Sequence, residues 1–116
     1  MQYLMMLYAE EAGMANLSAE QMQGALAAFG HFTNEVKDKK MLVGSNRLRP
    51  VSSATSVRVR DGKTLTTDGP FAETKEQLGG YYLLECKDLD EAIEYAAKIP
   101  GALWGTVEIR PIWPVM

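Results

Sequence analysis

Side chains that could do chemistry are concentrated in one polar stretch, residues 67–80, with the sequence TDGPFAETKEQLGG. Within it, Asp68 is our candidate for proton transfer, and Lys75 could stabilise negative charge that develops during a reaction. Glu73 and the earlier Arg47 could converge with them on one ligand, since pockets combine apolar walls with a few fixed polar groups. This combination predicts a small-molecule site beside a loop that is shaped by proline and glycine.

The same residues also have a structural interpretation. Asp68, Gly69 and Pro70 are typical of a turn, in which the aspartate caps backbone amides and the proline fixes φ. A turn alone does not require Phe71 or Glu73. The candidate ligand-binding residues of this stretch are therefore Gly69, Pro70, Phe71 and Glu73. The alternative for its acidic side chains is that they pair with a neighbouring lysine or face solvent, as most such charges do.

Two glycines and two arginines allow similar alternatives. Gly79 and Gly80 directly precede an apolar run, which indicates a β-bulge or a close approach of two backbones. The other interpretation is a nest of amides that binds an anion, so both glycines are also candidate ligand-binding residues. Arg58 and Arg60 lie on one face of a predicted hairpin, where they could meet an anionic ligand or simply face water.

His31 and Cys86 are the only histidine and the only cysteine in the chain. Histidine titrates near neutral pH, but His31 lies opposite the apolar stripe of its predicted helix, so we expect it to be exposed or at an interface. Cys86 stands in an apolar run and is expected in the core. One histidine and one cysteine cannot assemble a zinc site of the usual ligand types within one chain. We expect no metal and no other cofactor.

The chain of 116 residues, with a mass of 12.8 kDa, fits a single domain over residues 1–116. Hydrophobic residues make up 47% and charged residues 23%, which is typical of a globular domain and excludes disordered and collagen-like chains. A net charge of -3 argues against a nucleic-acid partner. The chain has no apolar run of roughly 20 residues, no secretory signal at its start, and only one cysteine. We therefore expect a cytoplasmic protein with no membrane partner.

Hydrophobic periodicity predicts two helices and six strands. One helix begins after Ser18, which can form a capping box with Gln21, and ends near Lys39. The other begins after Asp88 and stops before Pro100. The predicted strands cover residues 3–8, 41–44, 55–60, 63–67, 81–86 and 105–112.

This order is the plan of a split βαβ unit with an inserted hairpin, whose turn is Asp61-Gly62 because both positions of that turn type need positive φ. Two helices can cover only one face of the four-stranded sheet. Strands 3–8 and 81–86 carry large apolar side chains on both faces, so the uncovered face would be a larger apolar patch than monomers usually expose. We therefore expect a two-fold symmetric homodimer that pairs these faces.

The run TDGPFAETKEQLGGYYLLE resembles the signature of the DGPF proteins, a branch of the YCII-related family. Flanking segments fit the same pattern: VRVRDGK before the run, and DLDEAIEYAAKIP and VEIRPI after it. The resemblance covers nearly the whole chain. It implies a bacterial protein with an α+β fold of ferredoxin-like topology that forms a dimeric α+β barrel. It implies no known reaction.

Two further implications come with this resemblance. YciI-like relatives carry a histidine and an aspartate in a pocket, which indicates an enzymatic role there. When the sequences are matched, that histidine position falls near Phe29 of this chain. The chain thus departs from the pattern of these relatives, which weakens a mechanism based on a histidine and an aspartate here. Some family members are also encoded beside extracytoplasmic-function sigma factors.

Two functional hypotheses follow. The first is a small-molecule-binding protein, which could be an enzyme, whose pocket lies between the sheet and residues 67–80. The second is a non-enzymatic regulatory or interaction module associated with a sigma factor. In that case, Asp68, Gly69 and Pro70 would hold the loop for a partner surface.

Overall fold

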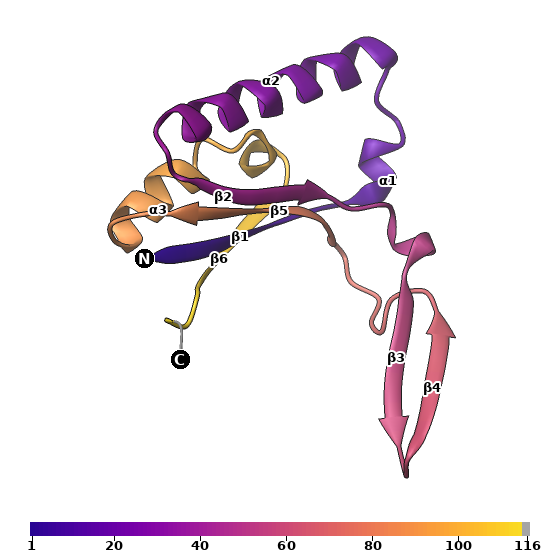
Figure 1. The fold of residues 1–116 in the computed structure, drawn as a ribbon. Coiled ribbons are helices and arrows are strands. Elements are labelled where there is room, and N and C mark those ends of the chain that lie inside the picture. Colours follow the sequence, from indigo (N-terminus) through magenta and orange to yellow (C-terminus); the bar gives the residue numbers. More distant parts are fainter. Residues whose placement is uncertain (115–116) are drawn as a thin grey trace.

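Two layers form the body of the protein: a four-stranded sheet and the helices that cover one of its faces (Figure 1). This computed structural model describes residues 1–114. In chain order, its elements are β1 (Gln2–Ala9), α1 (Glu11–Met14), α2 (Ala19–Asp38), β2 (Leu42–Arg47), η1 (Val51–Ser53), β3 (Thr55–Arg60), β4 (Lys63–Asp68), β5 (Gln77–Glu85), α3 (Leu89–Ala96), η2 (Pro100–Leu103) and β6 (Thr106–Pro111). None of the helices within residues 1–114 is long and apolar enough to cross a bilayer.

The main sheet has the strand order β2-β5-β1-β6, and its three neighbouring pairs are all antiparallel. Helix α2 connects β1 to β2, which lie on either side of β5. Helix α3 connects β5 to β6, which lie on either side of β1. This arrangement is the split βαβ plan of ferredoxin-like proteins, so the predicted fold class is confirmed. The short elements α1, η1 and η2 are additions to the predicted set.

Each long helix begins at a capping side chain. In α2, Gln21 N donates to Ser18 Oγ at 3.0 Å, and Ser18 N donates to Gln21 Oε1 at 2.9 Å, which is the predicted capping box. In α3, Glu91 N donates to Asp88 Oδ1 at 2.9 Å. A cap of this kind contributes roughly 1 kcal/mol, so these side chains fix where both helices start.

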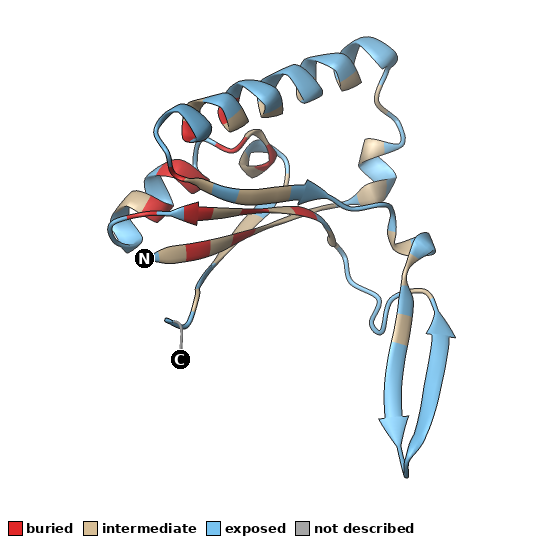
Figure 2. Cartoon of the chain, viewed as in Figure 1, coloured by how far each residue is buried: buried red, intermediate tan, exposed pale blue. Residues whose placement is uncertain are grey.

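The core lies between the helices and one face of the sheet (Figure 2). Because strand side chains alternate between faces, Tyr3 and Met5 of β1 both point toward the helices and are buried. Tyr82 and Leu84 do the same from β5. Cys86 is buried as predicted. The other residues of the hydrophobic core come from the helices and the segments that follow them: Phe32, Val36, Met41, Ala92, Tyr95, Ala96 and Ile99.

The opposite face of the main sheet carries apolar side chains that α2 and α3 do not cover. Leu4 and Met6 alternate with the core residues of β1 and are partly exposed. They lie opposite Leu83 and Tyr81 of β5, which are also partly exposed. We call the surface formed by these four residues the open face.

Strands β3 and β4 form a separate two-stranded hairpin, which we call the arm (residues 55–68). Asp61 and Gly62 at its turn have φ values of 52° and 73°, so the predicted hairpin turn is confirmed. The arm extends away from the main sheet on the side opposite α2 (Figure 1). The radius of gyration is accordingly 16.2 Å, whereas a compact chain of this length would have about 13 Å.

Candidate functional site

A cavity opens between the N-terminal half of α2 and the main sheet, where the helix diverges from the strands (Figure 1). Its volume is about 450 Å³, which lies within the roughly 300–1,000 Å³ of small-molecule sites. Met14 of α1 and Gly101 of η2 border it as well. The cavity is thus formed where four parts of the chain meet.

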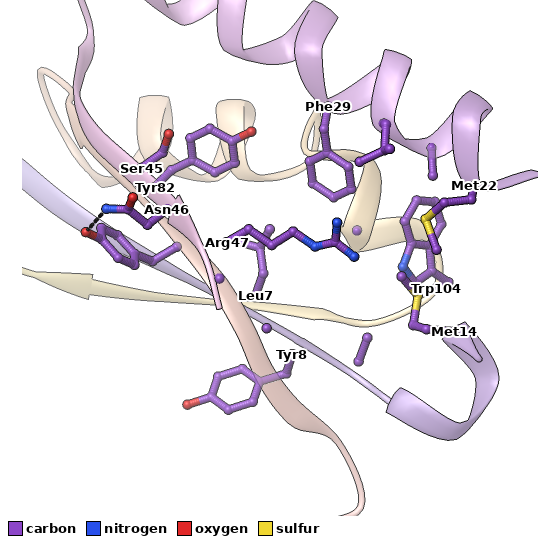
Figure 3. Close-up of a pocket in the computed structure, with 17 residues that line it drawn as sticks. Leu7, Tyr8, Met14, Met22, Phe29, Ser45, Asn46, Arg47, Tyr82 and Trp104 are labelled. Atoms are coloured by element: carbon purple, nitrogen blue, oxygen red, sulfur yellow. Dashed lines mark hydrogen bonds between the residues drawn. The ribbon is translucent and has the colours of Figure 1, made fainter. Parts of the chain in front are cut away.

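Apolar side chains make up most of the lining (Figure 3). The large ones are Leu7 of β1, Met14 of α1, Met22, Leu26 and Phe29 of α2, and Trp104 after η2. Phe29 and Trp104 meet edge to face, with ring centroids 6.2 Å apart. Aromatic pairs favour this geometry, so the two rings support each other as one wall of the cavity.

Arg47 is the one charged residue in the described lining. It stands at the end of β2, and Figure 3 shows its guanidinium pointing into the cavity. Among residues 1–114, the salt bridges and side-chain hydrogen bonds do not include Arg47. The cavity therefore presents a cation without a protein partner beside an apolar surface.

Three polar side chains in the lining, those of Asn46, Tyr81 and Tyr82, have hydrogen-bond partners inside the protein. Asn46 Nδ2 donates to Tyr81 Oη at 2.8 Å (Figure 3). Thr33 Oγ1 donates to Phe29 O at 2.8 Å, so its contact with Tyr82 Oη, also 2.8 Å, is one in which the tyrosine donates. These bonds tie the tyrosines to β2 and α2, and they leave Arg47 as the charged group available to a ligand.

Gly79 and Gly80 line the same cavity from β5. The pairing of β1 with β5 shifts register between Leu7 and Tyr8, opposite these glycines, so the predicted bulge is present. A Cβ atom on Gly80 would stand 2.9 Å from Asn46 O, which confirms the predicted close approach of two backbones. Neither glycine has a positive φ, and both lie in a paired strand, so the geometry is not that of an amide nest.

The structure brings three of the nine predicted site residues to this cavity, namely Arg47, Gly79 and Gly80. The other six lie outside its lining: Asp68, Gly69, Pro70, Phe71, Glu73 and Lys75. Of residues 67–80, only Gly79 and Gly80 of β5 border the cavity, so the cavity does not lie against the loop of residues 69–76, where the sequence predicts it. The reason is that this stretch connects the arm to β5, and the arm leaves the sheet on the side opposite α2 (Figure 1).

Gly69 and Gln77 show what this stretch does in the structure. Gly69 has a φ of 96°, which favours glycine, and its N–H donates to Ala54 O at 2.7 Å across the base of the arm. Gln77 Nε2 donates to Thr74 O at 2.6 Å, while Gln77 Oε1 accepts from Glu11 N at 2.9 Å. These contacts fit the turn interpretation and fasten the loop to α1.

Asp68, Glu73 and Lys75 are exposed, and the salt bridges found within residues 1–114 involve none of them. Glu73 thus faces solvent and does not pair with Lys75, while its role in ligand binding stays a prediction. The roles of Asp68 in proton transfer and of Lys75 in charge stabilisation stay predictions.

Several lining residues were not singled out by sequence reasoning. Met22, Leu26 and Phe29 belong to the apolar side of α2 and line the cavity, and an amphipathic pattern is the same over a core or over a cavity. No sequence signal marks Trp104. His31 is exposed on α2, as predicted. Phe29, near the position of the histidine in YciI-like relatives, lines the cavity but has no ionisable group.

The described lining contains no Asp, Glu, His, Lys or Cys, which are the side chains that most often act as general bases or nucleophiles. Cys86 is 1% exposed, and burial raises the pKa of its thiol, so the thiol stays protonated and unreactive. Within residues 1–114, no group of three His, Cys, Asp or Glu side chains is placed to hold a metal ion. The arrangement is suited to binding an apolar molecule that carries negative charge.

Fold and cavity together define a ferredoxin-like α+β protein with an apolar site that contains one cation. The family model of the YCII-related domain matches residues 1–116, and the chain belongs to the YCII-related family. It is also similar to an uncharacterized protein of Rhizobium meliloti (strain 1021), with 34% identity over 114 residues that cover 97% of this chain and 92% of the relative. The predicted family is thus confirmed. Neither comparison favours the sigma-factor hypothesis.

Proposed function

We propose that the protein binds a small, mainly apolar molecule in the cavity between α2 and the main sheet. The observation that carries this proposal is the cavity of about 450 Å³ with apolar and aromatic walls and Arg47 as its single charged residue. Small-molecule sites have this composition, because apolar walls provide affinity and a few polar groups fix the orientation. Voids left by imperfect packing are much smaller, since protein interiors are close-packed.

The proposal is one of binding, and it does not include turnover. Proton transfer requires the acid or base to lie within about 3 Å of the reacting group, directly or through one water. Asp68 lies outside the lining, and the lining has no other carboxylate and no histidine among its described residues.

We also propose that the protein is a homodimer whose subunits pair their open faces. Leu4, Met6, Tyr81 and Leu83 present apolar surface there without a cover from α2 or α3. A self-complementary patch of this kind closes on itself through a two-fold axis. A cytoplasmic location is part of the proposal, supported by the single, buried Cys86.

A ligand screen that includes a cavity-filling variant tests the binding function. Ala25→Phe places a ring in the cavity, because Ala25 lines it from α2. Ala27→Phe places the same ring on the exposed side of the same helix and serves as the control. We expect ligands detected by thermal shift or ligand-observed NMR to stabilise the wild type and Ala27→Phe, but not Ala25→Phe.

Two results would contradict the proposal. One is a set of ligands that binds all three proteins equally well, because those ligands would occupy some other surface. The other is a screen of apolar anions and their neutral analogues in which no compound binds the wild type.

A further inference from the structure

We propose that the ligand of this cavity is an apolar carboxylate with a single negative charge, held by a bidentate contact with Arg47. This inference rests on the proposed binding function and names its ligand class. Three features carry it: the free guanidinium, the charge balance of the site, and the chemistry of its walls.

The planar guanidinium of Arg47 is complementary to a planar anion. It points into the cavity and forms no ion pair within residues 1–114. Arg47 is exposed at the end of β2, so its guanidinium is open to an anion that enters the cavity from solvent. The donors of a guanidinium form a rigid fork that matches the two oxygens of a carboxylate.

The charge balance of the site limits the ligand to one negative charge. Arg47 is the single cation of the described lining, so one carboxylate neutralises it and a dianion would leave excess charge in an apolar site. The hollow beyond Met14 and Trp104 is lined by Glu10 and Glu76, which would repel a second negative group. Both features disfavour a dicarboxylate or a phosphate.

The walls define the body of the ligand. Met14 and Met22 have flexible, polarizable side chains that adapt to irregular shapes. Phe29 and Trp104 offer ring surfaces on which another aromatic group can pack. An aromatic or aliphatic hydrocarbon body that extends from the carboxylate at Arg47 therefore fits this lining.

Trp104 supplies the readout for a test, because it lines the cavity while the second tryptophan, Trp113, is 87% exposed. In a Trp113→Phe background, the fluorescence of Trp104 would be followed during titration with phenylbutyrate, with its amide, and with the phosphonate of the same hydrocarbon body. We expect the carboxylate to bind at least about tenfold more tightly than either analogue, which corresponds to about 1.4 kcal/mol.

Two variants connect this preference to the guanidinium. Arg47→Gln should abolish the preference for carboxylate over amide and leave the affinity for the amide within about twofold, because the apolar contacts remain. Arg47→Lys keeps the charge but lacks the planar fork, so it should retain part of the preference. Equal binding of amide and carboxylate, or tighter binding of the phosphonate, would overturn the ligand class and leave the binding function standing. Failure of all three compounds to bind would also overturn the ligand class, and the ligand screen described above then decides the binding function.

A second inference rests on the proposed homodimer and goes beyond it: we infer that the arm packs against the second copy of this chain. All strand residues of the arm except Ser56 are exposed. An isolated two-stranded hairpin is marginally stable at best in water. The arm therefore needs a surface to pack on, and its own main sheet does not provide one.

The two faces of the arm differ in chemistry. Residues that lie opposite each other in an antiparallel pair share a face, so Val57 lies beside Thr66 and Val59 beside Thr64. Apart from Asp68 at the base of the arm, the side chains of this face are β-branched and uncharged. Val57 and Val59 are 60% and 59% exposed. The other face carries the basic residues Arg58, Arg60 and Lys63. The face with the valines is the one suited to contact another protein surface.

The direction of the arm identifies a second copy as the partner. The arm projects from the end of the main sheet on the side of the open face (Figure 1). A subunit stacked on that face lies alongside the arm. Two-fold symmetry then gives each arm the same contact with the other subunit, so the assembly closes as a dimer.

Hydrogen exchange and sedimentation test this contact. We expect the amides of β3 and β4 to exchange at least about tenfold more slowly in the wild-type dimer than in a Leu83→Glu monomer. Val57→Lys combined with Val59→Lys should weaken dimerisation at least about tenfold, and Leu65→Lys, on the opposite face of the arm, less than about threefold. Equal exchange in dimer and monomer, equal effects of the two sets of substitutions, or a monomeric wild type would overturn the inference.

Discussion

Gly80 of β5 and Arg47 of β2 lie opposite each other in the main sheet, and a Cβ atom on Gly80 would stand 3.5 Å from the Cα of Arg47. It would stand even closer, at 2.9 Å, to the carbonyl oxygen of Asn46. Glycine at this position thus lets the end of β2 approach β5. The same approach sets the point from which the side chain of Arg47 enters the cavity.

We expect Gly80→Ala to lower the free energy of unfolding by about 1–3 kcal/mol, the usual effect of overpacking. The substitution should also weaken binding of phenylbutyrate, because β2 must move and Arg47 moves with it. Gly79→Ala is the matched control for stability, since its Cβ atom would have Leu7 O as nearest neighbour at an ordinary 3.9 Å; Gly79 also lines the cavity, so it is no control for binding. Urea unfolding and titration by Trp104 fluorescence measure both effects. Equal losses of stability in the two variants would contradict this account.

The features of the fold that could be predicted from the sequence are those that depend on local interactions. Ser18 and Gln21 cap α2 with bonds that span three residues, and Asp61-Gly62 adopts its turn because of its own backbone preferences. The strand order follows from the alternation of helices and strands along the chain. The cap and the turn depend on residues that are neighbours in the sequence, whereas the strand order is inferred from the order of the elements along the chain.

The cavity could not be predicted in the same way, because tertiary packing creates it. Trp104 and Met14 reach it from segments with no motif, and Arg47 borders a cavity only because α2 diverges from the sheet. The conspicuous stretch around Phe71, which is 81% exposed, was instead the strongest sequence signal. Its polar residues and turn chemistry indicate a loop, but they do not define which surface that loop meets.

Asp68→Asn tests whether the predicted catalytic residue contributes to the cavity. Because Asp68 lies outside the lining, we expect the affinity for phenylbutyrate to stay within about twofold of the wild type, as is usual for residues without ligand contact. Arg47→Gln in the same titration is the positive control. If Asp68→Asn lowered the affinity for phenylbutyrate by about tenfold or more, Asp68 would have to contribute to the binding site.

The thiol of Cys86 should react only after unfolding. It is 1% exposed, and burial raises its pKa, so little thiolate forms and reagents cannot reach it. We expect an aromatic disulfide reagent to label the folded protein at least about a thousandfold more slowly than the protein in denaturant, as unfolding equilibria of this size imply. A Cys86→Ala protein with Ala27→Cys on the exposed side of α2 is the control and should be labelled at once. Rapid labelling of native Cys86 would show that the core opens locally.

Glu35 connects α2 to the segment just after α3. This contact contributes to the stability of the fold, and its contribution depends on pH. Its Oε2 accepts from Lys98 Nζ at 3.0 Å and from Lys39 Nζ at 3.3 Å. The hydrogen bond from Lys98, followed by that from Lys39, lowers the pKa of Glu35 below its ordinary value of 4.5. A carboxyl group with a lowered pKa in the folded state adds stability above its unfolded pKa, and this stability is lost as the pH falls through the folded value.

Glu35→Gln should therefore lower the melting temperature at neutral pH, and the difference from the wild type should shrink as the pH falls below about 4.5. The effect is expected to be small and to decrease with salt, because the groups are solvated. Glu94→Gln, an exposed α3 residue outside the described salt bridges, is the matched control. Calorimetric scans across this pH range measure the difference. If the difference in melting temperature between the wild type and Glu35→Gln were constant with pH, the ion pairs of Glu35 would not contribute to stability.

Leu83→Glu should separate the subunits of the proposed dimer. Leu83 lies on the open face opposite Leu4, so the substitution would place a negative charge among apolar side chains on a face where Arg110 already pairs with Glu108. We expect the wild type to sediment at about twice 12.8 kDa and the variant at 12.8 kDa, with unchanged circular dichroism because Leu83 is not part of the core. Ala27→Glu, on the exposed side of α2, adds the same charge and should leave the dimer intact. A monomeric wild type at micromolar concentration, or equal dissociation of both variants, would show that the open face is not the interface.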